Sequence, residues 1–181
     1  MIQDFIKKVG EFHDAFGQKR GNVDAELRYK LFKEEFEEYK DAKTLVDKAD
    51  AIVDMLYIAC GTIDLHKWDM SDFNNMYFIE GVSEKESLRL ISVGIEKKKE
   101  DVYKYRGLLG NCLDLAYKNN IYNILPQLFD EVNASNMSKL DENGKPIIND
   151  GILDPSKPIG KILKGKNYFE PRLKEILENG N

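Results

Sequence analysis

Two short stretches of the chain carry carboxylates at spacings that suit a shared site. The first is Glu34-Glu-Phe-Glu-Glu38, and the second places Asp47, Asp50 and Asp54 at steps of three and four residues. Carboxylate oxygens suit hard cations, so we expect Mg²⁺ as the cofactor, with Mn²⁺ as a substitute. Because Mg²⁺ held by carboxylates usually also holds phosphates, the two stretches point to a phosphate-bearing substrate.

Helical periodicity places part of the first stretch on an apolar face. In a helix from about Asp24 to Ala42, Glu35 and Glu38 share the arc of Leu31 and Tyr39. A buried carboxylate is costly unless it is paired, so both need a cation, a proton or a base partner. Glu34 lies at the edge of this arc.

The link between this helix and the next one determines whether the two acidic sets meet. A second helix is predicted from Thr44 to about Leu65, and only one to three residues separate the two, so they should form an antiparallel hairpin. At 1.5 Å per residue, Glu38 and Glu35 lie roughly 8 and 13 Å from the turn, and the three aspartates lie roughly 5, 10 and 15 Å from it. Four or five carboxylates therefore converge if both sets face inward.

Some of these acids also have simpler interpretations. Thr44-Leu-Val-Asp47 reads as a capping box, so Asp47 is either a helix cap or a ligand. For Glu34 and Asp54, the alternative to metal binding is a side chain that is only exposed to solvent. A di-iron centre, which needs Glu three residues before His, is excluded because Gly10 and Ile63 occupy those positions before the two histidines.

The remaining periodic segments are also helical, so the predicted fold class is all-α. A first helix covers residues 2–16, more helix is expected within 68–120, and a further helix covers 124–137. Within 68–120, one helical period starts at a capping box at Ser83 and continues through Val102 and Tyr103, and a short helix follows at 108–117. All five prolines lie in the last third of the chain, so residues 141–171 are predicted to form a loop-rich arm.

Substrate contacts are expected from the C-terminal third of the chain and from the end of the first helix. Asn136 and Lys139 follow the apolar stripe of the 124–137 helix, and the arm adds Lys161, Lys164 and Tyr168. Lysines can hold phosphates and an aromatic ring can hold a base, although lysine-rich arms are usually only solvated. His13 and Gln18 are candidates for base recognition, next to Phe12 or Phe16. A histidine on an apolar helix face is more often a core residue.

Composition narrows the class of protein. The chain has 181 residues, which suits a single domain spanning 1–181, and its net charge of −5 disfavours nucleic-acid binding. No apolar run approaches the ~18 residues of a membrane span, and the N-terminus lacks a signal-peptide layout. With only two cysteines, we expect a reducing compartment and a cytoplasmic protein.

The chain resembles the MazG-like all-α nucleotide pyrophosphohydrolases in four blocks that follow one another in the family's order. This superfamily includes dimeric dUTPases and phosphoribosyl-ATP pyrophosphohydrolases. The acidic stretches resemble the family's Glu-Glu-x-x-Glu … Glu-x-x-Asp metal motif. The other segments that carry the resemblance are 11–17, 49–62, 131–139 and 161–169. The resemblance predicts a helical bundle whose antiparallel hairpin carries the metal site. Residues 68–120 are then a helical insertion that compact members lack.

The resemblance also implies roles for individual residues. Glu35, Glu38, Asp47 and Asp50 become Mg²⁺ ligands, and Glu34 becomes a further ligand or the group that orients the attacking water. The family has Glu at the position of Asp47, so Asp54 is an alternative ligand. Asn136, Lys139, Lys164 and Tyr168 become substrate-binding residues.

These observations predict an Mg²⁺-dependent nucleoside triphosphate pyrophosphohydrolase that controls nucleotide pools. Its products are the monophosphate and pyrophosphate, and Glu34 or Glu38 orients the water or takes its proton. By the resemblance, the enzyme is a homodimer or homotetramer. The alternatives are a non-catalytic nucleotide-sensing or assembly protein on the same scaffold, and a nucleic-acid binder that uses the lysine arm.

Overall fold

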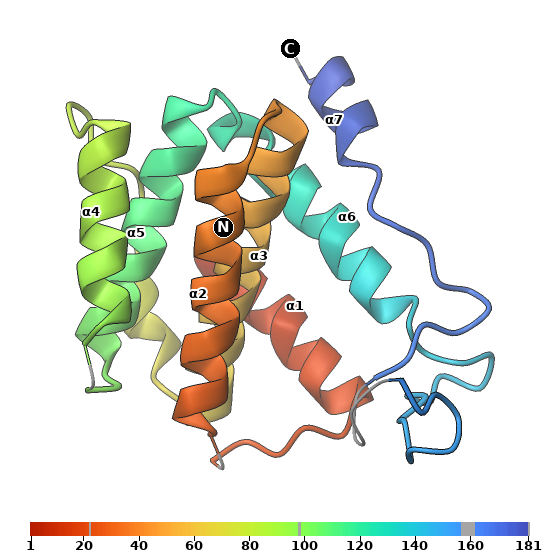
Figure 1. The fold of residues 1–181 in the computed structure, drawn as a ribbon. Helices are drawn as coiled ribbons and strands as arrows, with labels where there is room; N and C mark the ends of the chain where they lie inside the picture. The colour runs from red at the N-terminus through yellow and green to blue at the C-terminus, as the bar shows by residue number, and fades with distance from the viewer. Residues whose placement is uncertain (22, 98, 157–161, 181) are drawn as a thin grey trace.

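The computed structural model describes residues 1–21, 23–97, 99–156 and 162–180, and this part of the chain is helical without any regular strand (Figure 1). The prediction of an all-α fold is therefore confirmed. The α-helices are α1 (Ile2–Ala15), α2 (Ala25–Asp41), α3 (Leu45–His66), α4 (Glu84–Ile95), α5 (Val102–Lys118), α6 (Leu125–Met137) and α7 (Leu173–Asn179), with short 3-10 turns at Met70–Phe73 and Tyr122–Ile124.

The helices α2 and α3 form the predicted antiparallel hairpin. The side chain of Asp24 accepts a hydrogen bond from the backbone of Leu27, which fixes the start of α2. At the start of α3, Thr44 and Asp47 form the reciprocal capping box. Only three residues separate the two helices, so the second half of α2 lies beside the first half of α3.

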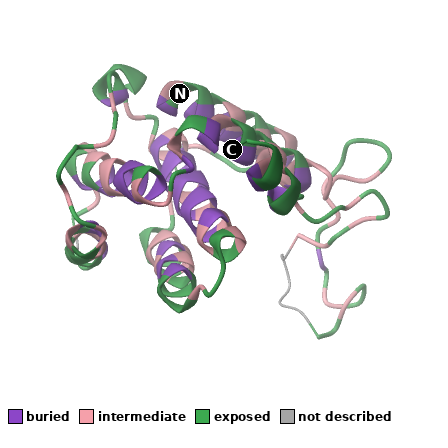
Figure 2. Cartoon of the chain, turned by 90° about the horizontal axis from the view of Figure 1, so that it is seen from above, coloured by how far each residue is buried: buried purple, intermediate pink, exposed green. Residues whose placement is uncertain are grey.

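The core is built around α3. Most of its side chains are buried, and α1, α2, α5, α6 and α7 all pack against it. Figure 2 shows the buried residues concentrated where these helices face one another. On one side, Phe5 of α1 stacks on Phe129 of α6, with ring centroids 3.8 Å apart and planes 1° from parallel. This stack holds α1 and α6 together over α3.

We expect truncation of this stack to destabilise the fold. Phe129 is fully buried and also stacks near Tyr57, so Phe129→Ala leaves a cavity that the rigid helices cannot close. The free energy of unfolding should fall by about 3–5 kcal/mol, measured by urea titration. A fall of less than about 1 kcal/mol would show that α6 contributes little to the core.

The segment between Trp68 and Asn120 contributes two helices that lie side by side. Helix α4 packs against α5, and α5 packs in turn against α3 (Figure 1). The prediction of one helical period through Val102 and Tyr103 is wrong, because α4 ends at Ile95 and Asp101 caps a new helix. The predicted short helix at 108–117 is the second half of this longer α5. The assignment of 68–120 as an insertion in a single domain stays a prediction.

The C-terminal third follows the expected order, with one addition. Helix α6 is followed by an arm whose described part has two isolated bridges, Leu140 with Pro146 and Ile148 with Ile162. The arm then leads into α7, which the sequence did not predict; its Leu173 and Leu177 are buried. No helix in the described part of the chain is both long and apolar enough to span a membrane.

Candidate active site

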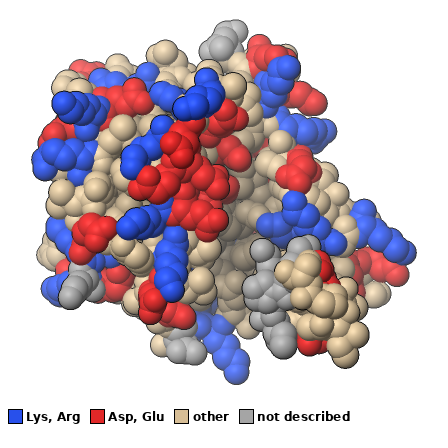
Figure 3. Space-filling model, in the orientation of Figure 1, with Lys and Arg blue, Asp and Glu red and all other residues tan. Residues whose placement is uncertain are grey.

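The acidic side chains of α2 and α3 line two neighbouring cavities. The first, which we call the acidic hollow, lies at the turn of the hairpin, where Figure 3 shows a dense patch of carboxylates. Its lining consists of Glu34, Glu37, Glu38, Asp41, Ala42, Lys43, Asp47 and Asp50. The second, which we call the central pocket, has a volume of about 400 Å³ and contains Glu35 and Asp54. Each cavity is therefore lined by acids from both helices.

The pKa values of Glu35 and Asp54 show that the carboxylates of the two cavities interact electrostatically. Burial, together with the charges of Asp54, Glu38, Glu34 and Asp50, raises the pKa of Glu35 to about 8. The pKa of Asp54 is raised to about 7 by burial and by the charges of Asp50 and Glu38, against the opposing effect of Lys139. Because neighbouring acids hinder the ionisation of Glu35 and Asp54, the cluster favours a bound cation or retained protons.

The five acids differ in their exposure. Glu34 and Glu38 are exposed, whereas Glu35, Asp50 and Asp54 are partly buried. Across the described ranges, no three carboxylate, imidazole or thiol groups stand close enough to form a ready-made metal centre. The donor set consists of oxygens alone, and this chemistry fits Mg²⁺ or Mn²⁺.

The structure gives Asp47 a capping role. Its Oδ2 accepts hydrogen bonds from the backbone N–H of Thr44, at 3.0 Å, and of Lys43, at 3.3 Å, and these bonds lower its pKa. Asp47 also borders the acidic hollow. Its prediction as a metal ligand remains untested, while Asp54 lies one helical turn beyond Asp50 and faces the other acids.

We therefore expect Asp47 and Asp54 to respond differently to substitution. Asp47→Ala should lower the midpoint of thermal unfolding by removing the cap, and the folded protein should keep at least about a tenth of its turnover. Asp54→Asn should keep the fold and lower turnover at least roughly a hundredfold, because it removes a central carboxylate. Pyrophosphate release and thermal unfolding of both variants decide this. The reverse order of activity losses would make Asp47 the ligand.

The central pocket brings together residues from both ends of the chain. The predicted residues His13, Gln18, Asn136 and Lys139 line it with Glu35 and Asp54, beside apolar walls that include Phe12, Tyr57 and Ile58. Lys139 donates a 2.6 Å hydrogen bond to Oδ1 of Asn136. The arm reaches this pocket through Ile162, which the sequence interpretation did not identify.

The other predicted residues of the arm lie outside both cavities. The Lys164 ammonium lies 2.7 Å from Glu170 and 4.2 Å from the centre of the Tyr168 ring. The charge of Glu170 contributes to the raised pKa of Asp50, so this part of the arm passes near the acids. Lys161 falls outside the described residues.

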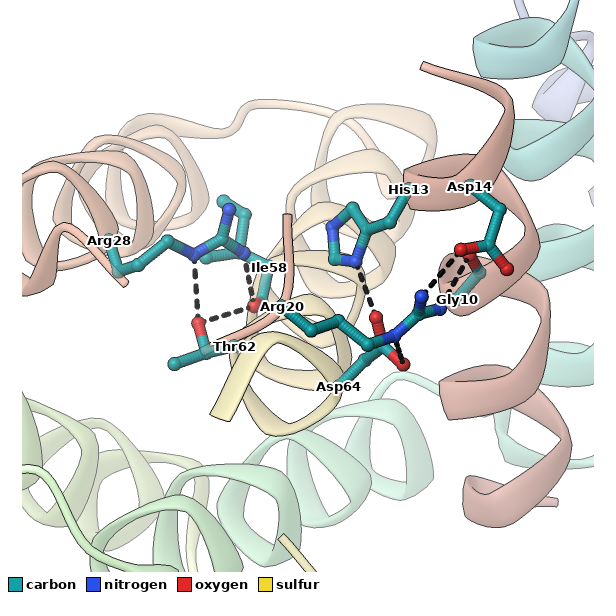
Figure 4. A network of polar contacts seen from close by, with 8 residues as sticks. All are labelled: Gly10, His13, Asp14, Arg20, Arg28, Ile58, Thr62 and Asp64. Atoms are coloured by element: carbon teal, nitrogen blue, oxygen red, sulfur yellow. Dashed lines mark hydrogen bonds and ion pairs between the residues drawn. The ribbon is translucent and has the colours of Figure 1, made fainter. Parts of the chain in front are cut away.

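A polar network that the sequence interpretation missed borders the central pocket through His13, Arg28 and Ile58 (Figure 4). Nδ1 of His13 lies 2.7 Å from Asp64, and Arg20 donates to the same carboxylate at 2.9 Å. Arg28 donates from Nε to Thr62 at 2.8 Å, and from Nη2 to the carbonyl of Ile58. The sequence held one signal for Arg28, because it precedes Glu35 by seven residues and so shares its helix face.

The all-α fold with its α2–α3 hairpin is the architecture that the resemblance to the MazG-like superfamily predicts. Residues 3–75 match the family model of phosphoribosyl-ATP pyrophosphohydrolase, a family within that superfamily. The predicted resemblance is thereby confirmed over this part of the chain, and the matched family consists of pyrophosphohydrolases. Comparisons with curated proteins and with solved structures gave no match.

Proposed function

We propose that the protein is an Mg²⁺-dependent pyrophosphohydrolase that converts a deoxynucleoside triphosphate to its monophosphate and pyrophosphate. One observation carries this proposal: Asp50 and Asp54 of α3 raise the pKa of Glu35 on α2, and Glu38 of α2 raises the pKa of all three. Such a group of acids needs divalent cations, and cations held in this way bind phosphates. The family match over residues 3–75 supports the same class of reaction.

The partly buried acids Glu35, Asp50 and Asp54, together with Glu38 at the rim, would hold the metal. When bound, Mg²⁺ polarises the phosphates and offsets their charge. Asp47 joins this set if its second oxygen is available beside the cap.

The chain's own residues orient the reactants. Glu34 and Glu38 are exposed at the edge of the acidic hollow, so one of them can orient a water molecule and accept its proton. Lys139 sits at the rim of the central pocket, where its ammonium group can neutralise a phosphate oxygen. The apolar walls of this pocket suit the nucleoside half of the substrate.

The biological role that follows is control of nucleotide pools. A homodimer or homotetramer is part of the proposal, on the basis of the family resemblance alone. The arm lysine Lys164 is proposed to reach the substrate when its contact with Glu170 opens.

Pyrophosphate release over a panel of substrates tests the proposal. The panel contains the four common dNTPs and dUTP, the NTPs and phosphoribosyl-ATP, each with Mg²⁺ and with EDTA. We expect Mg²⁺-dependent turnover of at least one dNTP, and ¹⁸O from labelled water then shows which phosphorus is attacked. Turnover of phosphoribosyl-ATP alone would replace the proposed substrate, and no turnover by folded, metal-bound protein would favour a nucleotide sensor.

A further inference from the structure

The most unusual group in the central pocket is the guanidinium of Arg28. A guanidinium has five N–H donors, and two hydrogen bonds from Arg28 reach the protein, to Thr62 and to Ile58. No ion pair joins Arg28 to a carboxylate within the described ranges, and burial lowers its pKa. A partly buried cation with spare donors is costly unless a ligand supplies acceptors.

The neighbouring His13 offers a hydrogen-bond acceptor. Because the Asp64 carboxylate can only accept, Nδ1 of His13 carries the proton and Nε2 has a free lone pair. Burial, and to a smaller degree Arg28 and Arg20, lower the pKa of His13, and Asp64 opposes this effect. The net lowering of the pKa favours the neutral ring. Figure 4 shows the ring between Asp64 and Arg28, with one nitrogen directed at Asp64.

Gly61 brings the two groups close together. A Cβ atom at this position would lie 3.0 Å from Nη2 of Arg28 and 3.3 Å from Cε1 of His13. Both side chains therefore pack over the bare backbone of α3, where a larger residue would displace them. The result is a donor set and an acceptor side by side in the lining of the central pocket.

Helix α5 packs against α3 next to this arrangement. Burial raises the pKa of Tyr105 on α5, and Glu100 and Thr62 also shift it, so the hydroxyl group of Tyr105 lies close to both side chains. Thr62 accepts the hydrogen bond from Nε of Arg28. Thr62 is therefore a positioning residue for the Arg28 guanidinium, and Tyr105 of the 68–120 segment lies next to it.

We propose that Arg28 and His13 together read the base of the substrate and select a lactam edge, a carbonyl oxygen next to a ring N–H, as in uracil, thymine and guanine. A carbonyl oxygen has two lone pairs and can accept from two N–H groups of Arg28, while the ring N–H donates to Nε2 of His13. Adenine has no carbonyl oxygen, and the carbonyl of cytosine lies between ring nitrogens that carry no hydrogen, so neither base offers both groups. A phosphate is a poorer fit, because it has no donor for His13. This inference rests on the proposed function and specifies its substrate.

Kinetics with substrates that differ only in the base provide the test. Arg28→Met removes the donors and keeps much of the stem, and Arg28→Lys keeps the charge without the fork. Arg89→Met is the matched control, since Arg89 is exposed and pairs with Glu86 on α4. For wild type we expect kcat/KM at least about tenfold higher for dUTP, dTTP or dGTP than for dATP and dCTP.

In both Arg28 variants this preference should disappear. We expect kcat/KM for the lactam substrates to fall roughly 10- to 100-fold, while the base-free deoxyribose 5′-triphosphate changes less than about twofold. An equal loss with the base-free compound would overturn the inference, because Arg28 would then act on the phosphates or the fold. A wild type without base preference would overturn it as well.

A binding measurement separates this inference from the proposed function. Calorimetry with dUMP, dTMP, dGMP and dCMP requires no turnover. Preferred binding of the lactam monophosphates, lost in Arg28→Met and kept in Arg89→Met, supports base reading even if no triphosphate is hydrolysed. Equal binding of all four monophosphates contradicts base reading even if hydrolysis is found.

Discussion

Replacing Glu35 by glutamine should abolish pyrophosphate release while making the metal-free protein more stable. Glu35 lies between the central pocket and the other acids, so its loss removes a ligand from the middle of the proposed metal site. We expect turnover to fall at least roughly a thousandfold. The metal-free fold should gain on the order of 1 kcal/mol, since the neutral amide does not repel Asp54 and the solvent that reaches this pair weakens the effect.

Glu26→Gln is the matched control for this change. Glu26 is also on α2, but it is exposed and forms an ion pair with Lys30 on the outer face. Its substitution should leave turnover and metal binding unchanged. If Glu35→Gln instead unfolds the metal-free protein, or keeps normal turnover when folded, then Glu35 is a structural residue and the proposed site is wrong.

Magnesium should also reverse the pH dependence of stability that the acidic cluster imposes. The pKa values of Glu35 and Asp54 are about 8 and about 7 in the folded protein, above the ordinary values of 4.5 and 3.8. As pH rises from about 4 to 8, the unfolded chain loses these protons before the folded one does. The contribution of both groups to stability is therefore present at low pH and lost as pH rises.

The titration of His13 changes stability in the opposite direction as pH rises. A reference variant is therefore needed to isolate the effect of the two acids. The lowered pKa of His13 makes the folded protein gain stability as pH rises through about 6.5. The double variant Glu35→Gln, Asp54→Asn keeps His13 and lacks the two acids, so the difference between wild type and this variant isolates the cluster. In EDTA, wild type should lose stability relative to the variant between pH 5 and pH 8.

With saturating Mg²⁺, thermal unfolding of wild type should show the largest stabilisation at pH 8, where the acids are free to bind metal. The double variant should show little stabilisation by Mg²⁺ at any pH. If wild type in EDTA gains stability relative to the double variant as pH rises, the carboxylates do not face one another in solution.

The features that depend on short-range sequence signals could be predicted. The hairpin follows from the short link after Asp41 and from the Thr44 cap, and both are local. The electrostatic effect of Asp54 and Asp50 on Glu35 follows from helical geometry once that hairpin is accepted. His13 and Asn136 could be assigned to a pocket because each continues an apolar face with a polar group.

Features that depend on tertiary contacts could not be predicted. The ends of α4 and α5 depend on a cap at Asp101 within a stretch that keeps an apolar period. Arg28 looked like an ordinary charged residue, because its partners Ile58 and Thr62 lie 30 and 34 residues away on another helix. Helix α7 is only seven residues long and is stabilised by packing rather than by its own periodicity.

The location of a bound Mn²⁺ ion tests the central claim most directly. Crystals grown with Mn²⁺ give an anomalous difference peak at the metal. We expect a peak between α2 and α3 with oxygens of Glu35, Glu38 and Asp50 or Asp54 at roughly 2.1 Å, and loss of that peak in Glu35→Gln. Mn²⁺ bound elsewhere, with these carboxylates directed into solvent and free of metal, would contradict the account.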